Sequence, residues 1–326
     1  MVTNLKSWIS VAVFGCLLLA TISCQHVPVP QPARAQRVAQ SGPRTAKRNV
    51  ETYGAAIRLG RLKDSAIKES SGLVASRSAP GFFWTHNDSG DGPFIYAFDS
   101  SGAAKGVWRV SGASALDWED MSAGPGPLRG QNYLYIGDIG DNNERRSEII
   151  VYRVVEPKIN ARNSRSSKTK PAVTESAEAI HLKYPDGKHD AETLMVHPVT
   201  GSIFIVTKIP FANPGIYQAS PPFSNDGPTS LQRLGELDVP SLLGGIITGG
   251  DISPDGRRVA FCDYMQAYEI ILPAGAPFES IWKHPLQPIT LGQRKQGEAI
   301  AYRLDGKALL ATSEGLRAPL IQVTRK

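Results

Sequence analysis

The stretch HDAETLMVHP, residues 189–198, places two acidic side chains, Asp190 and Glu192, before a short apolar run that ends in a turn. Four other stretches follow the same plan: KESSGLVAS (68–76), DWEDMSAG (117–124), GGDISPDG (249–256) and GEAIAYRLDG (297–306). A unit that recurs roughly every 50 residues indicates a radial or stacked array of supersecondary units. The repeat therefore predicts an all-β fold, a β-propeller.

The residues after each acidic start predict a blade of four antiparallel strands. A first strand such as Leu194–Val196 leads into a tight turn rich in Pro, Asp or Gly, and an apolar second strand such as Ile203–Thr207 follows. A third strand comes after a polar loop. We expect weaker fourth strands at residues 106–110, 179–184, 231–237 and 280–283. Five units predict five blades; the alternative is six, with the sixth hidden in residues 238–248 or 157–176.

The last unit reaches the end of the sequence after only three strands. Residues 55–62 (AAIRLGRL) precede the first acidic start and belong to no other blade. We therefore expect this N-terminal strand to complete the last blade and close the ring, which protects the sheet edges. The predicted propeller spans residues 55–326 and contains a basic insert at 158–176 that we expect to be disordered.

The N-terminus resembles a secretory signal. Lys6 precedes an apolar run from Trp8 to Ile22, which is short for a transmembrane span, and Ser23-Cys24 follows. This ending resembles a bacterial lipobox and predicts lipidation at Cys24. Residues 1–24 would be the signal peptide, and the basic, Pro-rich residues 25–54 a flexible tether from the membrane to the propeller. We expect an exported protein anchored at the cell envelope; cleavage after Ala35, giving a periplasmic or secreted protein, is the alternative.

The net charge of +6 is concentrated outside the predicted blades. Residues 26–50 and 157–171 each carry five cations and no acid, and without these and Lys6 the rest of the chain has a net charge of −5. This distribution argues against a nucleic-acid-binding surface on the propeller. Of the three cysteines only Cys262 lies in the predicted propeller, which excludes an intramolecular disulfide or a Cys/His zinc site there.

The polar motifs fall in two classes of loop that a propeller brings to one face. One class enters the first strands and the other joins the second and third strands; the opposite face receives only plain turns. Because the first strands line the axis, their carboxylates should converge at its mouth and repel one another. A hard divalent cation, Ca²⁺ by default, is the usual compensation. The predicted metal ligands are Glu69, Glu119, Glu192, Asp251 and Glu298.

Further residues in these loops predict a ligand-binding rim: Asn87, Asp88, Asp138, Asp141, Asn142, Arg145 and Lys208. If the ion is catalytic, the candidate bases are Asp117, Asp190 and His189. A structural interpretation stays open for each of these residues. Asp and Asn cap turns, an Asp can bond the backbone of a neighbouring blade, and His189 can be a hydrogen-bonded surface residue.

Several long motifs occur together: WTHNDSGD (84–91), DWEDM (117–121), LYIGDIGDN (134–142), YPDGKHDAETLMVHP (184–198), GGDISPDG and GEAIAY. Over roughly residues 58–324 they resemble a family of exported bacterial β-propeller proteins that carries no established reaction. In arrangement the chain is also similar to the calcium-dependent propellers of the SMP-30/gluconolactonase type. That resemblance implies an axial ion held by acidic and amide side chains from different blades.

Two functions are consistent with these observations. The first is a lipid-anchored binding or scaffold protein whose rim takes a small molecule or a cell-envelope ligand. The sequence contains no nucleophile elbow, HExxH motif or Ser-His-Asp order, which favours this hypothesis. The alternative is a metal-dependent hydrolase that acts on a lactone, ester or phosphoester, with Lys208 and Arg145 holding an anionic group.

Overall fold

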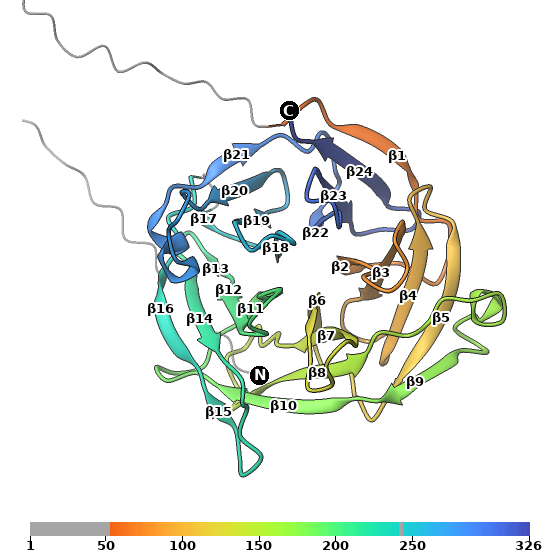
Figure 1. Cartoon of the computed structure of the whole chain (residues 1–326), viewed down its shortest axis with the longest axis horizontal. Coiled ribbons are helices and arrows are strands. Elements are labelled where there is room, and N and C mark those ends of the chain that lie inside the picture. Colours follow the sequence, from red (N-terminus) through yellow and green to blue (C-terminus); the bar gives the residue numbers. More distant parts are fainter. Residues whose placement is uncertain (1–52, 241–243) are drawn as a thin grey trace, which may run out of the picture. The chain divides into compact units, whose positions relative to one another are not determined.

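The computed structural model describes residues 53–240 and 244–326. Five sheets surround a central axis as the blades of a β-propeller (Figure 1), which confirms the all-β fold and the count of five blades. The helices among the described residues are short 3-10 turns, and none has the length and apolar character that a bilayer span requires. The predicted signal peptide, Cys24 and all but the last two residues of the tether lie outside the described residues.

Each blade begins with its innermost strand and continues outward. Blade 1 consists of β2 (Ser70–Ala75), β3 (Phe82–Asn87), β4 (Phe94–Asp99), β5 (Ala104–Ser111) and β9 (Ala172–Ser176). Blade 2 consists of β6 (Trp118–Pro125), β7 (Asn132–Asp138), β8 (Ile149–Val155), β10 (Glu178–Lys183) and β15 (Thr229–Ser230). Blade 3 consists of β11 (Ala191–Val196), β12 (Ile203–Thr207), β14 (Gly215–Ala219) and β16 (Gln232–Glu236).

The last two blades have four strands each. Blade 4 consists of β18 (Gly249–Ile252), β19 (Arg258–Cys262), β20 (Ala267–Ile271) and β21 (Gln287–Ile289). Blade 5 consists of β22 (Gly297–Tyr302), β23 (Ala308–Ser313), β24 (Pro319–Thr324) and β1 (Ile57–Arg61). A short separate pair is formed by β13 (Ile209–Pro210) and β17 (Gly244–Gly245).

The hydrophobic core is divided among the spaces between neighbouring blades. Five clusters of buried apolar side chains occur, and each joins strands of two adjacent blades. A strand that packs on both faces cannot alternate apolar and polar residues. This explains why second strands such as β12 (IFIVT) are mostly apolar and fully buried.

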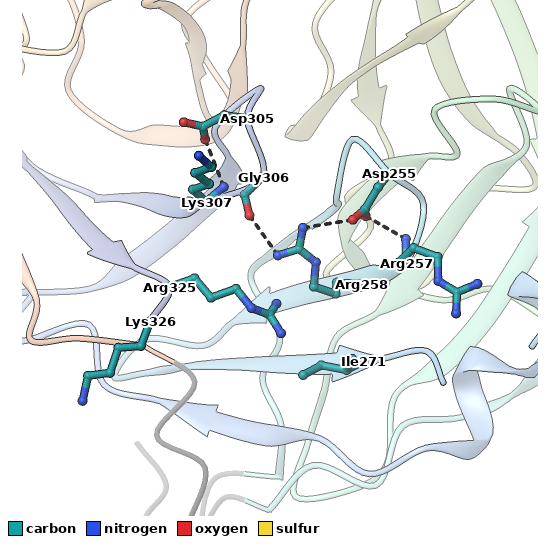
Figure 2. Close-up of a pocket in the computed structure, with 9 residues that line it drawn as sticks. All are labelled: Asp255, Arg257, Arg258, Ile271, Asp305, Gly306, Lys307, Arg325 and Lys326. Carbon is teal, nitrogen blue, oxygen red and sulfur yellow. Dashed lines mark hydrogen bonds and ion pairs between the residues drawn. The ribbon is translucent and has the colours of Figure 1, made fainter. Parts of the chain in front are cut away.

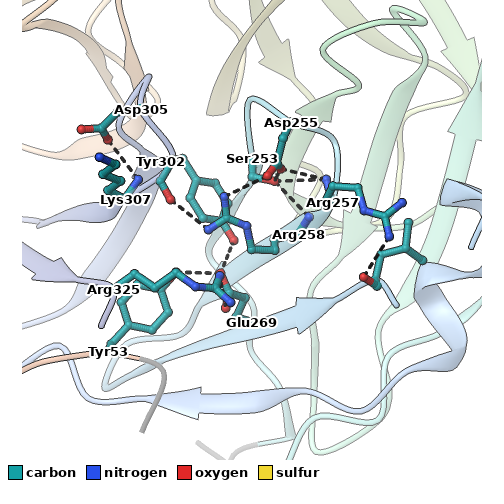
Figure 3. Close-up of polar contacts among 12 residues, drawn as sticks. Tyr53, Ser253, Asp255, Arg257, Arg258, Glu269, Tyr302, Asp305, Lys307 and Arg325 are labelled. Atoms are coloured by element: carbon teal, nitrogen blue, oxygen red, sulfur yellow. Dashed lines mark hydrogen bonds and ion pairs between the residues drawn. The ribbon is translucent and has the colours of Figure 1, made fainter. Parts of the chain in front are cut away.

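The N-terminal strand closes the ring as predicted. β1 pairs with β24 in antiparallel register. A buried carboxylate strengthens this seam, because Glu269 of β20 accepts hydrogen bonds from the hydroxyls of Tyr53 at 2.6 Å and Tyr302 at 2.8 Å and lies 3.4 Å from Arg325 (Figure 3). The network ties the first described residue to blades 4 and 5.

The basic insert differs from its prediction. Residues 158–176 were expected to be disordered, but they contain the 3-10 turn η1 (Asn163–Arg165) and strand β9, which pairs in parallel with β5. The Ser166 hydroxyl donates to the Val107 carbonyl at 2.8 Å, and Lys168 forms an ion pair with Asp91. The open edge of blade 1 thus supplies backbone and charged partners that the composition of the insert does not reveal.

Three of the four predicted outer strands are found as β5, β10 and β16. The fourth prediction, at 280–283, is wrong. That segment belongs to the 3-10 helix η2 (Phe278–Lys283), and β21 is the outer strand of blade 4. Phe278 and Trp282, four residues apart, both pack on Phe204, a spacing that suits a helical turn rather than a strand.

Candidate metal centre at the mouth of the propeller

The loops that enter the first strands and the loops after the second strands meet at one end of the axis, which we call the mouth. In each blade a backbone hydrogen bond joins the two loop classes. Asp88 N–H donates to the Glu69 carbonyl at 3.1 Å, and Gly140 N–H to the Asp117 carbonyl at 3.2 Å. Equivalent bonds run from Lys208 to Asp190, from Gly297 to Tyr264 and from Glu314 to Gln296. The fold therefore gathers both sets of polar motifs at the mouth.

Three carboxylates from two blades converge there. One oxygen each of Asp88, Asp117 and Glu119 lie within 4.8 Å of one another, and this is the one group of three or more acidic, His or Cys ligand atoms found in residues 53–240 and 244–326. Gly140 makes room for two of them, because a Cβ at that position would overlap Oε1 of Glu119 and Oδ2 of Asp117. Asp88 follows β3, and the other two residues lead into or begin β6.

Burial and repulsion from nearby acids disfavour the ionised forms of Asp117 and Glu119. Burial raises the pKa of Asp117 to about 6, and the nearby carboxylates of Asp88, Asp190 and Asp138 act in the same direction. The pKa of Glu119 is raised well above its usual value by burial and then by Glu192 and the other acids. A bound cation would reverse this effect by stabilising the charged carboxylates.

The predicted ligands Glu192 and Glu298 do not belong to this group of three carboxylates, although the charge of Glu192 acts on Glu119. Beside Glu192 the chain supplies its own cation. Lys208 forms an ion pair with Glu192, and its ammonium lies 5.7 Å from the centre of the Tyr264 ring. Glu298 accepts a hydrogen bond from the Gln296 amide at 2.9 Å. Burial raises the pKa of Glu192 to about 7 and that of Glu298 to about 8, and repulsion from Glu192 contributes to the latter.

A β-bulge occurs in each of the three inner strands that direct a glutamate into the mouth, and the inner strand β2, which contains no glutamate, is bulged as well. The ladder register shifts at Glu119 in β6, at Glu192 in β11 and at Glu298 in β22. A bulge leaves a residue out of the regular pairing and re-aims its side chain. Each of these glutamates is the second residue of its strand, next to or within the irregular step. The sequence alone gave no signal for the bulge.

Asp251, a predicted metal ligand, is not part of the group of Asp88, Asp117 and Glu119. It is the third residue of β18, whose pairing with β19 is regular, so Gly250 takes the place of the glutamate. Asp251 accepts a hydrogen bond from the Tyr302 N–H at 2.9 Å, in the next blade, and Arg77 acts on it electrostatically. Asp120, also a third residue, likewise accepts from Leu194 N–H of the next blade at 3.0 Å. Both carboxylates thus hold neighbouring blades together through hydrogen bonds to backbone N–H groups.

The fifth predicted ligand, Glu69, is exposed and lies opposite Glu314 in an isolated β-bridge at the edge of the mouth. Glu314 carries a charge that acts on Glu298 but was missed by the sequence analysis. Its loop, SEGLRAP, belongs to the same class as the loops of Asp88 and Lys208. The five predicted metal ligands are therefore spread over the mouth and the inner strands.

Several predicted rim residues hold the loops in place. Asn87 is buried and accepts from the N–H groups of Lys68 at 2.8 Å and Glu69 at 3.0 Å. Asp138 pairs with Arg146 at 2.8 Å, and Asp141 accepts from the Arg146 N–H at 2.6 Å. The residues of this set that are exposed are Asn142 and Arg145.

The candidate bases occupy different surroundings. Asp190 accepts from the Asp141 N–H at 2.8 Å, and burial raises its pKa. His189 contacts Asp186 at 3.0 Å and the Tyr217 hydroxyl at 3.1 Å, as expected for a hydrogen-bonded surface histidine. Asp117 alone of the three belongs to the carboxylate triad.

Comparison with known proteins gives matches among solved structures, and two of these have TM-scores below 0.5. No protein-family model and no curated protein sequence matches the chain. Among solved structures, a chain of a nidogen–laminin complex is 14% identical, with a TM-score of 0.39 over 76% of this chain and 72% of that one. A gluconolactonase from Xanthomonas campestris is 10% identical, with a TM-score of 0.40 over 85% of this chain and 99% of that one. Neither likeness bears on the site.

Proposed function

We propose that the chain is an exported, lipid-anchored β-propeller that holds a divalent cation, Ca²⁺ by default, between Asp88, Asp117 and Glu119. The mouth around that ion would bind a small molecule or a cell-envelope ligand. The observation that carries the cation is the approach of three carboxylate oxygens to within 4.8 Å of one another. Oxygens that share one Ca²⁺ at about 2.3–2.6 Å can be at most about 5.2 Å apart, so the triad fits a common ion.

The donor set suits a hard cation that also contacts a ligand. All three side chains offer oxygen, the donor that Ca²⁺ and Mg²⁺ prefer. Ca²⁺ takes about six to eight oxygens, which leaves positions for water or for ligand oxygens when the carboxylates bind through one oxygen each. Asp88 and Asp117 are only partly buried, so solvent and ligand can reach the ion. The support for export and lipidation is the apolar run Trp8–Ile22 followed by Ser23-Cys24.

A metal-dependent hydrolase of a lactone, ester or phosphoester is the second candidate. One observation favours it: Asp190, which is not a member of the triad, acts electrostatically on Asp117, and burial raises the pKa of Asp190. A general base works best when its pKa lies near the operating pH. In that case Asp190 would accept a proton from water at the mouth, and Lys208 would help to hold an anionic substrate group.

The cation site is tested by thermal and denaturant unfolding of the full chain with Ca²⁺ or a chelator. An ion that binds only the folded state adds about 2.7 kcal/mol at 100 times its dissociation constant. We expect Glu119→Gln to abolish this gain because it removes a ligand charge. Glu314→Gln is the matched control, since Glu314 is a carboxylate of the mouth outside the triad and should leave the Ca²⁺ response intact. Equal Ca²⁺ responses in both variants would refute the site.

A further inference from the structure

A second charged cavity lies at the end of blades 4 and 5 away from the mouth. The turns that join β18 to β19 and β22 to β23 border it, where the sequence predicted only plain turns. Its volume is about 560 Å³. The residues that line it are Asp255, Arg257, Arg258, Ile271, Asp305, Gly306, Lys307, Arg325 and Lys326 (Figure 2).

Cations predominate in this lining. Five of its side chains are basic and two are acidic. Both acids already serve their own turns, because Asp255 accepts from the Arg257 N–H at 3.0 Å and Asp305 accepts from the Lys307 N–H at 3.0 Å. Carboxylates therefore compensate the cations only in part: Asp255 contacts Arg258 at 3.3 Å, and Glu269, outside the lining, contacts Arg325 at 3.4 Å.

Two of the guanidinium groups are held in place. Arg258 is buried, lies 5.3 Å from the centre of the Tyr302 ring and donates to the Gly306 carbonyl at 2.9 Å. Gly306 has a φ of +64°, and a Cβ there would come within 2.8 Å of Nη2 of Arg258, so glycine is needed beside this side chain. Arg325 is directed toward Glu269 at 3.4 Å (Figure 3). Such fixed donors lose little entropy when they bind an anion.

Lys307 completes the cationic lining from a different direction. Its side chain is exposed, and it forms no ion pair among the described residues. It follows the turn of blade 5, whereas Arg258 begins β19 of blade 4 and Arg325 follows β24. Figure 2 shows these three side chains around the same cavity. An anion there would face donors from both blades.

We propose that this cavity binds a phosphate group, carried either by a soluble phosphate ester or by a phospholipid headgroup. Guanidinium groups match phosphate oxygens with parallel hydrogen bonds, and an ammonium adds a compact charge. The cavity is large enough for a phosphate together with part of the molecule that bears it. A phosphate between Arg258, Lys307 and Arg325 would link the two blades beside the network that holds Tyr53, so binding should stabilise the closed ring. This site does not depend on the cation proposed at the mouth.

The test is the melting temperature of the full chain in inorganic phosphate against chloride at equal ionic strength. Phosphate at about 100 times its dissociation constant should raise the melting temperature by roughly 5 °C. Lys307→Gln should raise the phosphate concentration needed for half of that shift by about tenfold, because one charge-assisted contact is lost. The matched control is Lys183→Gln, which removes an exposed lysine from β10 in blade 2 and should behave as the wild type. No phosphate-specific shift, or equal midpoints in both variants and the wild type, would overturn the proposal.

The source of the phosphate is distinguished by soluble probes in the same assay. If a lipid headgroup is the ligand, short-chain phosphatidylglycerol should act at lower concentration than glycerol phosphate, and short-chain phosphatidylcholine should act weakly. If a soluble ester is the ligand, glycerol phosphate should act at the lower concentration. In either case Lys307→Gln should weaken the preferred probe, and a response to both probes that does not depend on Lys307 would overturn the site.

Discussion

The mouth of the propeller contains two groups of carboxylates that are compensated differently. Glu192 is paired with Lys208, so one group receives a cation from the chain itself. One oxygen each of Asp88, Asp117 and Glu119 lie within 4.8 Å of one another, yet none of the three has an ion pair in the part of the chain that the structure describes. Arg146, whose charge acts on Asp117, is paired with Asp138.

This difference shows why the number of acids alone does not locate a metal site. Two unit charges about 4 Å apart interact by about 4 kcal/mol at an effective dielectric constant of 20. The lysine supplies a compensation of this order beside Glu192, whereas the triad must take up protons or an external cation. An ion is therefore expected at the triad and not at the axial glutamates as a set.

The largest expected effect comes from removing the internal cation. Lys208→Met should lower the free energy of unfolding by about 3–5 kcal/mol in calcium-free buffer at pH 7.5, because the buried Glu192 must then either stay charged without a partner or take up a proton. The side chains of Lys208 and Glu192 are only 15% and 9% exposed, so solvent screens the pair weakly. Urea unfolding measures the change, with Lys183→Met as the control. A decrease in the free energy of unfolding of less than about 1 kcal/mol would mean that Lys208 does not compensate Glu192, and the two groups of carboxylates would not differ in this respect.

A second prediction concerns pH and separates protonation from cation binding. Asp117, Glu192 and Glu298 have pKa values raised to about 6, 7 and 8, whereas unfolded carboxyl groups titrate near 4. The native state thus holds more protons between pH 4 and 8, and its extra stability is lost as the pH rises through the raised values. Without Ca²⁺, the free energy of unfolding should fall by at least about 2 kcal/mol from pH 5 to pH 8.5.

Saturating Ca²⁺ should reduce that fall, because the ion stabilises the charged form of the triad. In Glu119→Gln the benefit of Ca²⁺ should vanish while the contribution of Glu192 and Glu298 to the pH dependence remains. Urea titrations at three pH values, with and without Ca²⁺, measure both effects. A flat profile without Ca²⁺ would mean that the carboxylates of the mouth are already compensated.

The sequence was sufficient for the fold because the fold repeats. Five acidic starts set the number of blades, and residues 55–62 identified the closing strand through the missing fourth strand of the last unit. The site was harder to predict because its geometry depends on β-bulges at Glu119, Glu192 and Glu298. In fully buried strands no alternation of polar and apolar residues marks the register, so a shift of one residue leaves no trace in the pattern.

The roles of individual residues show the same limit. Alignment by acidic character placed Asp251 with the glutamates, although Gly250 occupies their position in the strand. Asp88 was predicted for the rim and Asp117 as a base, yet both share one group with Glu119. The ion pair of Lys208 with Glu192 joins a loop to a strand of the same blade, and no spacing rule for loops predicts how far a lysine side chain reaches.

The smallest expected effect comes from Asp251. It tests whether Asp251 only holds neighbouring blades together while the triad binds the ion. Asp251→Asn keeps an oxygen that can accept from Tyr302 N–H, and burial raises the pKa of Asp251 to about 7, so the native aspartate is itself partly neutral. The free energy of unfolding at pH 7 should change by less than about 1 kcal/mol, and the Ca²⁺ response should stay as in the wild type. The same isosteric change at Asp117 should abolish that response, because Asp117 lies in the triad. Calorimetric titration of both variants with Ca²⁺ makes the comparison. If Asp251→Asn no longer bound Ca²⁺ while Asp117→Asn still did, the ion would bind at Asp251 and not at the triad. A residue in a regularly paired inner strand could then be a metal ligand.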